Sequence, residues 1–117
     1  MQLTEVTFRD AVPVDGYGPG FFRVGGQVLY GAVIVTTERA AVWAGLEDAE
    51  ALLRLADEID VLFVGMGSEI AYLPSDLRQQ LEAAGLGVEV MNSPSACRTY
   101  NVLVSEGRRV ALAALPV

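Results

Sequence analysis

Short apolar runs broken by glycine and proline fill residues 1–30, a pattern typical of extended segments joined by turns. The Gly25-Gly26 pair between two such runs predicts a tight hairpin, because the favoured hairpin turns need positive φ at their centre. We expect a small antiparallel layer with strands over Glu5–Phe8, Val12–Tyr17, Phe21–Val24 and Gln27–Tyr30, separated by Gly16, Gly18-Pro19-Gly20 and Gly25-Gly26.

The middle of the chain changes from strand-like to helical spacing. Gly31–Val35 and Ala40–Ala44 are continuous apolar runs, which suit strands covered on both faces. Leu46–Ala56 has apolar residues at helical spacing and an acidic opposite face, which we interpret as solvated surface. From here strands and helices alternate. The expected strands are Val61–Val64, Val88–Met91 and Val110–Leu115, and the expected helices are Ser75–Ala84 and Ser93–Glu106.

Residues that commonly begin or end helices support the two later helices. Gly85 and Gly107 stand where helices commonly end in a glycine of positive φ, and Ser93 with Pro94 predicts an N-cap followed by a first turn. Alternating strands and helices require crossovers, so we expect an α/β fold. Its central sheet would be mixed and mostly parallel with helices packed on it, beside the small antiparallel N-terminal layer. The length of 117 residues fits a single domain spanning 1–117.

Composition narrows the classes of function. A net charge of -7 would repel nucleic acid, so we expect no nucleic-acid partner. The chain has no histidine and one cysteine, which excludes multi-cysteine zinc sites and Ser-His or Cys-His hydrolysis, and we expect no metal and no cofactor. No apolar run is long enough to cross a bilayer and the N-terminus lacks the regions of a signal peptide, so we expect a cytoplasmic protein without a transmembrane segment.

Two turns carry the candidate site. Gly65-Met66-Gly67 follows one predicted sheet strand and Asn92-Ser93 follows the next, and parallel strands would place both turns at one edge. Open α/β sheets bind ligands beyond the carboxyl ends of their strands, where helix N-termini present free amides. The candidate ligand-binding residues are Gly65, Met66, Gly67, Ser93, Cys97, Arg98 and Asn101, and we assign no catalytic residue.

Each candidate also has a structural interpretation. The glycine turn is a fragment of a phosphate-binding motif or simply a tight turn. Cys97 is a buried structural thiol, a redox thiol or a nucleophile, and the missing histidine favours the first. Arg98 and Asn101 lie three residues apart on one helix face. We expect this face to form either a clamp for an anion or carbonyl group, or an ordinary salt bridge to a carboxylate.

Two further features have simpler explanations. Arg108 and Arg109 would neutralise the C-terminal end of the helix that precedes them. Asp15 and the aromatic segment from Gly16 to Phe22 would form either a mobile lip or a contact surface for another protein.

Taken together, several motifs resemble a widespread family of small domains of unknown function that includes mitochondrial complex I assembly factor 3 and its bacterial relatives. The motifs are Tyr17-Gly18-Pro19-Gly20-Phe21, Gly65-Met66-Gly67, Leu73-Pro74 with Leu77-Arg78, Gly85 to Glu89, Ala96 to Leu103 and Glu106 to Val110. The resemblance implies a three-layer α/β fold with a mixed central sheet. It implies a protein-binding task and no established reaction.

These observations leave two hypotheses. The leading one is a non-enzymatic binding or assembly module with a protein partner, in which the Gly65 turn and the Ser93 to Asn101 helix form the recognition crevice. The alternative is a small-molecule or anion-binding protein, weakly enzymatic at most, in which Arg98 and Asn101 hold a carboxylate or phosphate and Cys97 modulates the pocket.

Overall fold

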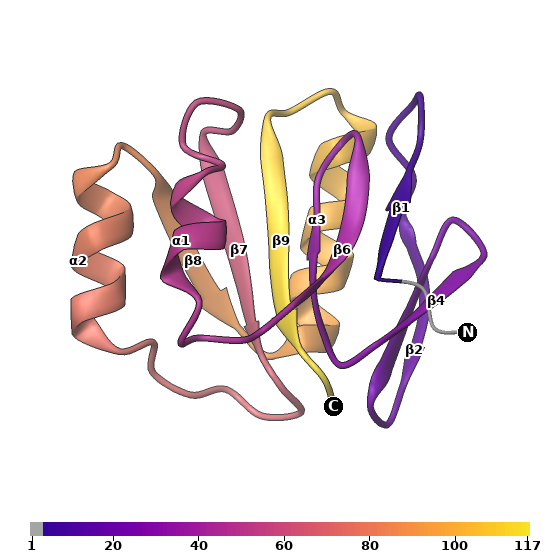
Figure 1. Cartoon of the computed structure of the whole chain (residues 1–117), viewed down its shortest axis with the longest axis horizontal. Coiled ribbons are helices and arrows are strands. Elements are labelled where there is room, and N and C mark those ends of the chain that lie inside the picture. Colours follow the sequence, from indigo (N-terminus) through magenta and orange to yellow (C-terminus); the bar gives the residue numbers. More distant parts are fainter. Residues whose placement is uncertain (1–3) are drawn as a thin grey trace.

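A computed structural model describes residues 4–117 and contains two sheets (Figure 1). The larger sheet has six strands in the order β1-β6-β5-β9-β7-β8, and the smaller has three in the order β2-β3-β4. The strands of the larger sheet are β1 (Glu5–Thr7), β5 (Ala32–Val35), β6 (Arg39–Trp43), β7 (Val61–Met66), β8 (Gly87–Met91) and β9 (Val110–Leu115). Those of the smaller sheet are β2 (Val14–Gly18), β3 (Phe21–Val24) and β4 (Gln27–Tyr30). The strand predicted over Glu5–Phe8 was expected in this smaller layer, but β1 pairs with β6 and belongs to the larger sheet.

The larger sheet is mixed, as expected. The expectation that it is mostly parallel is not met within residues 4–117, because its parallel pairing is confined to β9, β7 and β8. The strand β9 also pairs antiparallel with β5, and β5 and β6 form an antiparallel hairpin. Because the turn between β5 and β6 is too short for a crossover, these two strands have to run antiparallel. The C-terminal strand therefore lies inside the sheet and joins its two halves.

One face of the larger sheet is covered by two helices, and the other face is covered by the third helix together with the smaller sheet. Alternate residues of β7 show this directly, since Leu62 and Val64 join one hydrophobic cluster and Phe63 joins the other. The first cluster packs under α1 (Ala49–Leu53) and α2 (Ser75–Ala83), and the second packs under α3 (Ser93–Ser105) and the β2-β3-β4 sheet. The result is the expected three-layer α/β fold.

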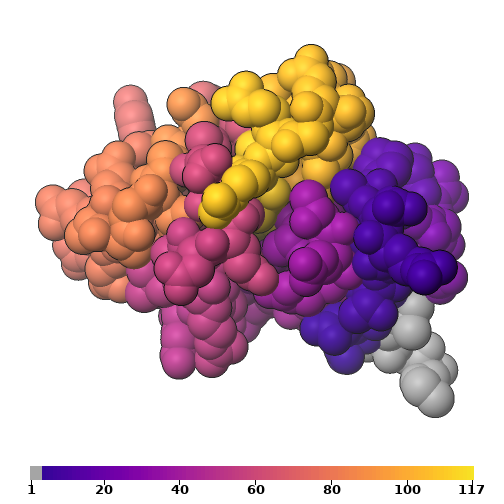
Figure 2. Space-filling view, turned by 90° about the horizontal axis from the view of Figure 1, so that it is seen from above, coloured from indigo at the N-terminus to yellow at the C-terminus, as the bar shows by residue number. Residues whose placement is uncertain are grey.

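Figure 2 shows how sequence order maps onto space, with the N-terminal segments in indigo and purple at one end of the molecule. The segments around α2 lie at the other end. No helix within residues 4–117 is long and apolar enough to cross a membrane.

The extent of α1 and the N-cap of α3 differ from the predictions, whereas α2 and α3 end within one residue of the predicted ends. The helix predicted over Leu46–Ala56 spans Ala49–Leu53. It begins at Ala49 because Asp48 caps it by accepting a hydrogen bond from the Ala51 N–H at 3.3 Å. The N-cap of α3 is Asn92 instead of Ser93, and the Asn92 side chain accepts from the Ser95 N–H at 2.8 Å. The hydroxyl of Ser93 is engaged elsewhere.

The predicted glycine signals are confirmed at three places. Gly25 and Gly26 have φ of 58° and 80° and form the turn between β3 and β4. Gly85 and Gly107 have φ of 93° and 79° and follow the last residues of α2 and α3.

Candidate functional site

Ser93 joins three elements at the carboxyl edge of the parallel strands. Its backbone N–H donates to the Gly67 carbonyl at 2.8 Å, and its hydroxyl accepts from the Gly67 N–H at 2.9 Å. The same hydroxyl donates to the carbonyl of Leu115 at 2.6 Å. Because Ser93 is fully buried, these bonds hold the ends of β7 and β9 against the start of α3 without competition from water.

Gly65 is required by this close approach. A Cβ at Gly65 would lie 2.7 Å from the hydroxyl oxygen of Ser93 and 2.8 Å from its Cα, closer than real contacts allow. Gly67 has a φ of +97°, which disfavours any other residue. The structure thus brings Gly65, Gly67 and Ser93 together, as their placement after adjacent strands predicted, and protein atoms fill the space between them.

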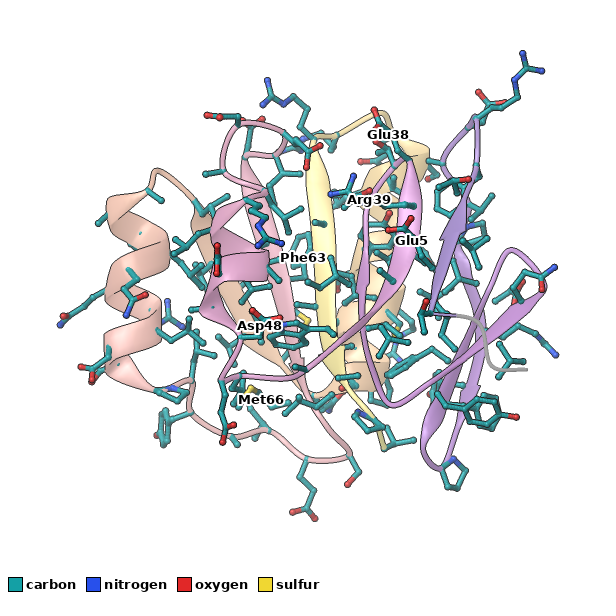
Figure 3. All side chains as sticks on the ribbon, in the orientation of Figure 1. Glu5, Glu38, Arg39, Asp48, Phe63 and Met66 are labelled. Carbon is teal, nitrogen blue, oxygen red and sulfur yellow. The ribbon has the colours of Figure 1, made fainter. Side chains whose placement is uncertain are left out.

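Met66 lies at the same edge but on the other side of the sheet. Figure 3 places it at the carboxyl end of β7, below Phe63, and Glu38 lies toward the opposite edge. The Met66 side chain is half-buried against the cluster under α1 and α2. It therefore faces away from α3 and its neighbours.

Asn101 binds the backbone of a distant strand. Its amide oxygen accepts from the Val14 N–H at 2.9 Å, and its amide nitrogen donates to the Val14 carbonyl at 2.9 Å. The side chain imitates a neighbouring strand and fastens β2 to α3. Sequence reasoning placed Asn101 beside Arg98 because they share a helix face, but a partner 87 positions away gave no local signal.

Arg98 points into solvent from α3. Its guanidinium donates to the Ser95 hydroxyl at 3.2 Å and, among residues 4–117, forms no salt bridge. With Thr99, Val102 and Leu103 it borders an open surface hollow. Of the two interpretations of Arg98, the ordinary salt bridge is absent from the described chain.

Cys97 faces the core from the next position of α3. It is 3% exposed, and burial raises the pKa of its thiol from 9.0 to about 11, although the Arg98 charge opposes this. The thiol is therefore protonated at neutral pH, which disfavours the redox and nucleophile interpretations.

The loop between β7 and α2 carries a surface that the sequence interpretation passed over. Ile70 is 74% exposed and Tyr72 is 99% exposed. Beside them lies a cavity of about 360 Å³ lined by Ile70, Ala71, Tyr72, Leu73, Arg78 and Val90. The sequence did offer a signal for this surface. Ile70 and Tyr72 are large apolar residues in a segment whose apolar positions follow neither helical nor strand spacing, so neither residue is needed for the core.

A second cavity, of about 400 Å³, lies at the opposite edge, between the turn after β5 and the end of α3. Its rim includes Thr37, Glu38 and Arg108. Arg109 donates to the carbonyls of Glu58 and Asp57 at 3.2 and 3.1 Å. It thus fastens the loop before β7, a contact beyond the predicted neutralisation of the helix end.

Comparisons with known proteins agree with this architecture. Residues 14–115 match the family model described as "Protein of unknown function (DUF498/DUF598)". An uncharacterized protein of Rhodobacter capsulatus is 50% identical over 117 residues, covering 100% of this chain and 94% of the relative. A crystal structure described as an outer membrane protein from Bartonella henselae superposes with a TM-score of 0.83 and 33% identity, covering 94% of this chain and 98% of that one.

A vertebrate relative supports the resemblance to assembly factors. NADH dehydrogenase [ubiquinone] 1 alpha subcomplex assembly factor 3 of Danio rerio is 30% identical over 107 residues, which cover 86% of this chain. The match spans 62% of that protein, so the chain corresponds to less than two thirds of its length. The family expected from the motifs is thereby confirmed: this chain belongs to the DUF498/DUF598 family of proteins of unknown function and is related to the complex I assembly factors.

Proposed function

We propose that this chain is a non-enzymatic protein-binding module that assists the assembly of a larger complex, with respiratory complex I as its client. The relationship to proteins named as complex I assembly factors supports the choice of client. The exposed apolar side chains of the loop between β7 and α2 support the assignment of protein binding as the task.

The observation that carries the proposal is the exposure of Ile70 and Tyr72, at 74% and 99%. Leaving both side chains in water forgoes the free energy of burying them, about 1.5 to 3 kcal/mol for a large apolar side chain. Aromatic residues are enriched where proteins bind one another. Two such side chains beside a cavity of about 360 Å³ suit a surface that a partner covers.

The residues of the predicted crevice contribute to this module mainly by holding the exposed loop in place. The polar groups of Ser93 and Gly67 bind each other, and the amide of Asn101 binds Val14, so these groups are engaged within the chain. They fix the end of β7, from which the exposed loop departs. Of the predicted ligand-binding residues, Arg98 offers a polar side chain to an incoming molecule.

A complementation experiment in the native host tests the proposal. The gene is deleted, and membranes are assayed for NADH oxidation and for intact complex I. We expect both to fall, wild type to restore them, and Ile70→Ser with Tyr72→Ser to fail. Val42→Ser, which alters a valine 41% exposed on β6, serves as the control and should restore both.

The outcomes separate the two parts of the proposal. Unchanged complex I after deletion contradicts the client. Full restoration by the Ile70 and Tyr72 variant, present at wild-type levels, contradicts the assigned surface.

Anion binding through Arg98 stays a second prediction, supported by a guanidinium that forms no salt bridge within residues 4–117. Inorganic phosphate should then raise the melting temperature of wild type, and the rise should be absent in Arg98→Ala. An equal shift in both proteins would contradict it.

The cytoplasmic location expected from the sequence also stays a prediction. Cell fractionation with detection of the untagged protein tests it. Recovery in the outer membrane, as the description of the Bartonella relative suggests for that protein, would contradict it.

A further inference from the structure

The strand β8 ends the larger sheet on the side of α2, so one side of its backbone has no neighbouring strand. The N–H of Gly87 donates to the Asp60 carbonyl at 2.9 Å, toward β7. Because backbone groups alternate along a strand, the N–H and C=O groups of Val88 and Val90 face away from β7. Arg78 confirms this direction, since its guanidinium reaches the Val88 carbonyl from α2 at 3.4 Å.

The carboxyl half of this edge is unpaired within residues 4–117. The carbonyl of Val88 has Arg78 as a partner, whereas in residues 4–117 no other element bonds to the outward N–H and C=O of Val90. In Figure 1, α2 lies beyond β8 and the loop after β7 passes below it. A sheet edge with unpaired backbone groups is a template for another strand.

The cavity described above adjoins the same position. Val90 forms part of its wall, together with Leu73 and the exposed side chains of Ile70 and Tyr72. A strand pairing with β8 would thus have an apolar hollow beside it for one of its side chains. Strand addition usually combines these two features, with backbone bonds giving affinity and pockets giving specificity.

Charge indicates which kind of strand would fit. The loop after β7, α2 and β8 together carry one cation, Arg78, and the carboxylates of Glu69, Asp76, Glu82 and Glu89. Arg78 is itself close to Glu82, at 3.4 Å. The surroundings are therefore acidic, and a second copy of this chain, with its own charge of -7, would be repelled.

We propose that the edge of β8 receives a short extended segment of a different protein, basic in charge, which pairs with the backbone of Val88 and Val90. One apolar side chain of that segment enters the cavity beside Ile70 and Tyr72. This inference rests on the proposed protein-binding function and specifies the partner of the same surface.

Amide hydrogen exchange of the free protein tests the edge itself. We expect the Val90 N–H to exchange faster than that of Met91, which faces β7, by about a hundredfold. Strong protection of Val90 at low protein concentration would mean that the edge is already covered, and would overturn the proposal.

Short random peptides displayed on phage then serve as the probe for binding. We expect selected peptides to combine Arg or Lys with an apolar residue. Synthetic copies should slow exchange at Val88 and Val90 by about tenfold or more. Failure to select any peptide, or protection confined to other elements, would overturn the proposal, as would protection that grows with protein concentration alone.

A pair of substitutions at one position separates backbone pairing from side-chain contact. Val90→Pro removes the outward N–H without removing a bond to β7, and Val90→Ala trims the side chain but keeps the N–H. We expect the peptide to bind Val90→Pro about tenfold more weakly than Val90→Ala. If both variants fold and bind the peptide equally well, strand pairing is overturned. If Val90→Pro does not fold, the hydrogen-exchange measurement with the peptide tests strand pairing instead.

Failure here is distinguishable from failure of the proposed function. A partner that covers Ile70 and Tyr72 without touching β8 would leave complementation sensitive to those two residues while Val88 and Val90 stay unprotected. If complementation is insensitive to Ile70 and Tyr72, and Val88 and Val90 also stay unprotected, the protein-binding surface is rejected altogether.

Discussion

At the scale of single residues, Ser93 has the most demanding position. Its hydroxyl bonds both the Gly67 N–H and the Leu115 carbonyl while fully buried. Ser93→Ala would leave both groups without a partner, and we expect a loss of about 2 to 3 kcal/mol in the free energy of unfolding. Urea denaturation measures it. Ser95→Ala, which removes a hydroxyl bonded to exposed Arg98, is the control and should cost about 0.5 kcal/mol or less.

Equal losses for the two serine variants would contradict the role given to Ser93. The position also explains why the N-cap was wrongly predicted. Asn92 and Ser93 are both good capping residues, and the choice depends on Gly67 and Leu115, which are distant in the sequence.

Cys97 makes stability depend on alkaline pH. Burial raises the pKa of its thiol to about 11, whereas in the unfolded chain it ionises near 9.0. Its contribution is therefore full below the unfolded pKa and is lost as the pH rises through 9.0 toward about 11. We expect wild type to lose about 2 kcal/mol more than Cys97→Ala across this range. Urea unfolding at each pH measures it, and parallel losses in the two proteins would contradict it.

At the scale of elements, the attachment of the smaller sheet depends on Asn101. Both of its bonds go to the backbone of Val14 at the start of β2. Asn101→Ala should cost about 1 to 3 kcal/mol and speed exchange of the amides in β2 and β3. Exchange measured by NMR tests this, with Val102→Ala, 56% exposed on the same helix, as the control. Exchange that rises equally in both variants would contradict the attachment.

Elements were predictable where the signal is local. Gly85 and Gly107 mark the ends of α2 and α3 because positive φ is a property of one residue. The order of strands was less accessible. Neither apolar periodicity nor turn residues reveal that β9, last in the chain, enters the sheet between β5 and β7.

At the scale of the whole molecule, the sequence correctly predicted that the glycine turn and the start of α3 meet at one edge of the sheet, but it did not establish the surface that we propose for a partner. Gly65, Gly67 and Ser93 lie where the alternation of strands and helices placed them, and they bind one another. The exposure of Ile70 and Tyr72 is a property of the folded surface, because apolar residues in a loop are buried or exposed according to what packs over them.

The central claim is that another protein covers the loop after β7. The most direct measurement replaces Tyr72 with a photo-crosslinking amino acid in living cells and compares it with the same replacement at Val42. We predict a discrete cross-linked product at position 72 that contains a different protein, with little at position 42. No product at position 72, or the same products at both positions, would contradict the account.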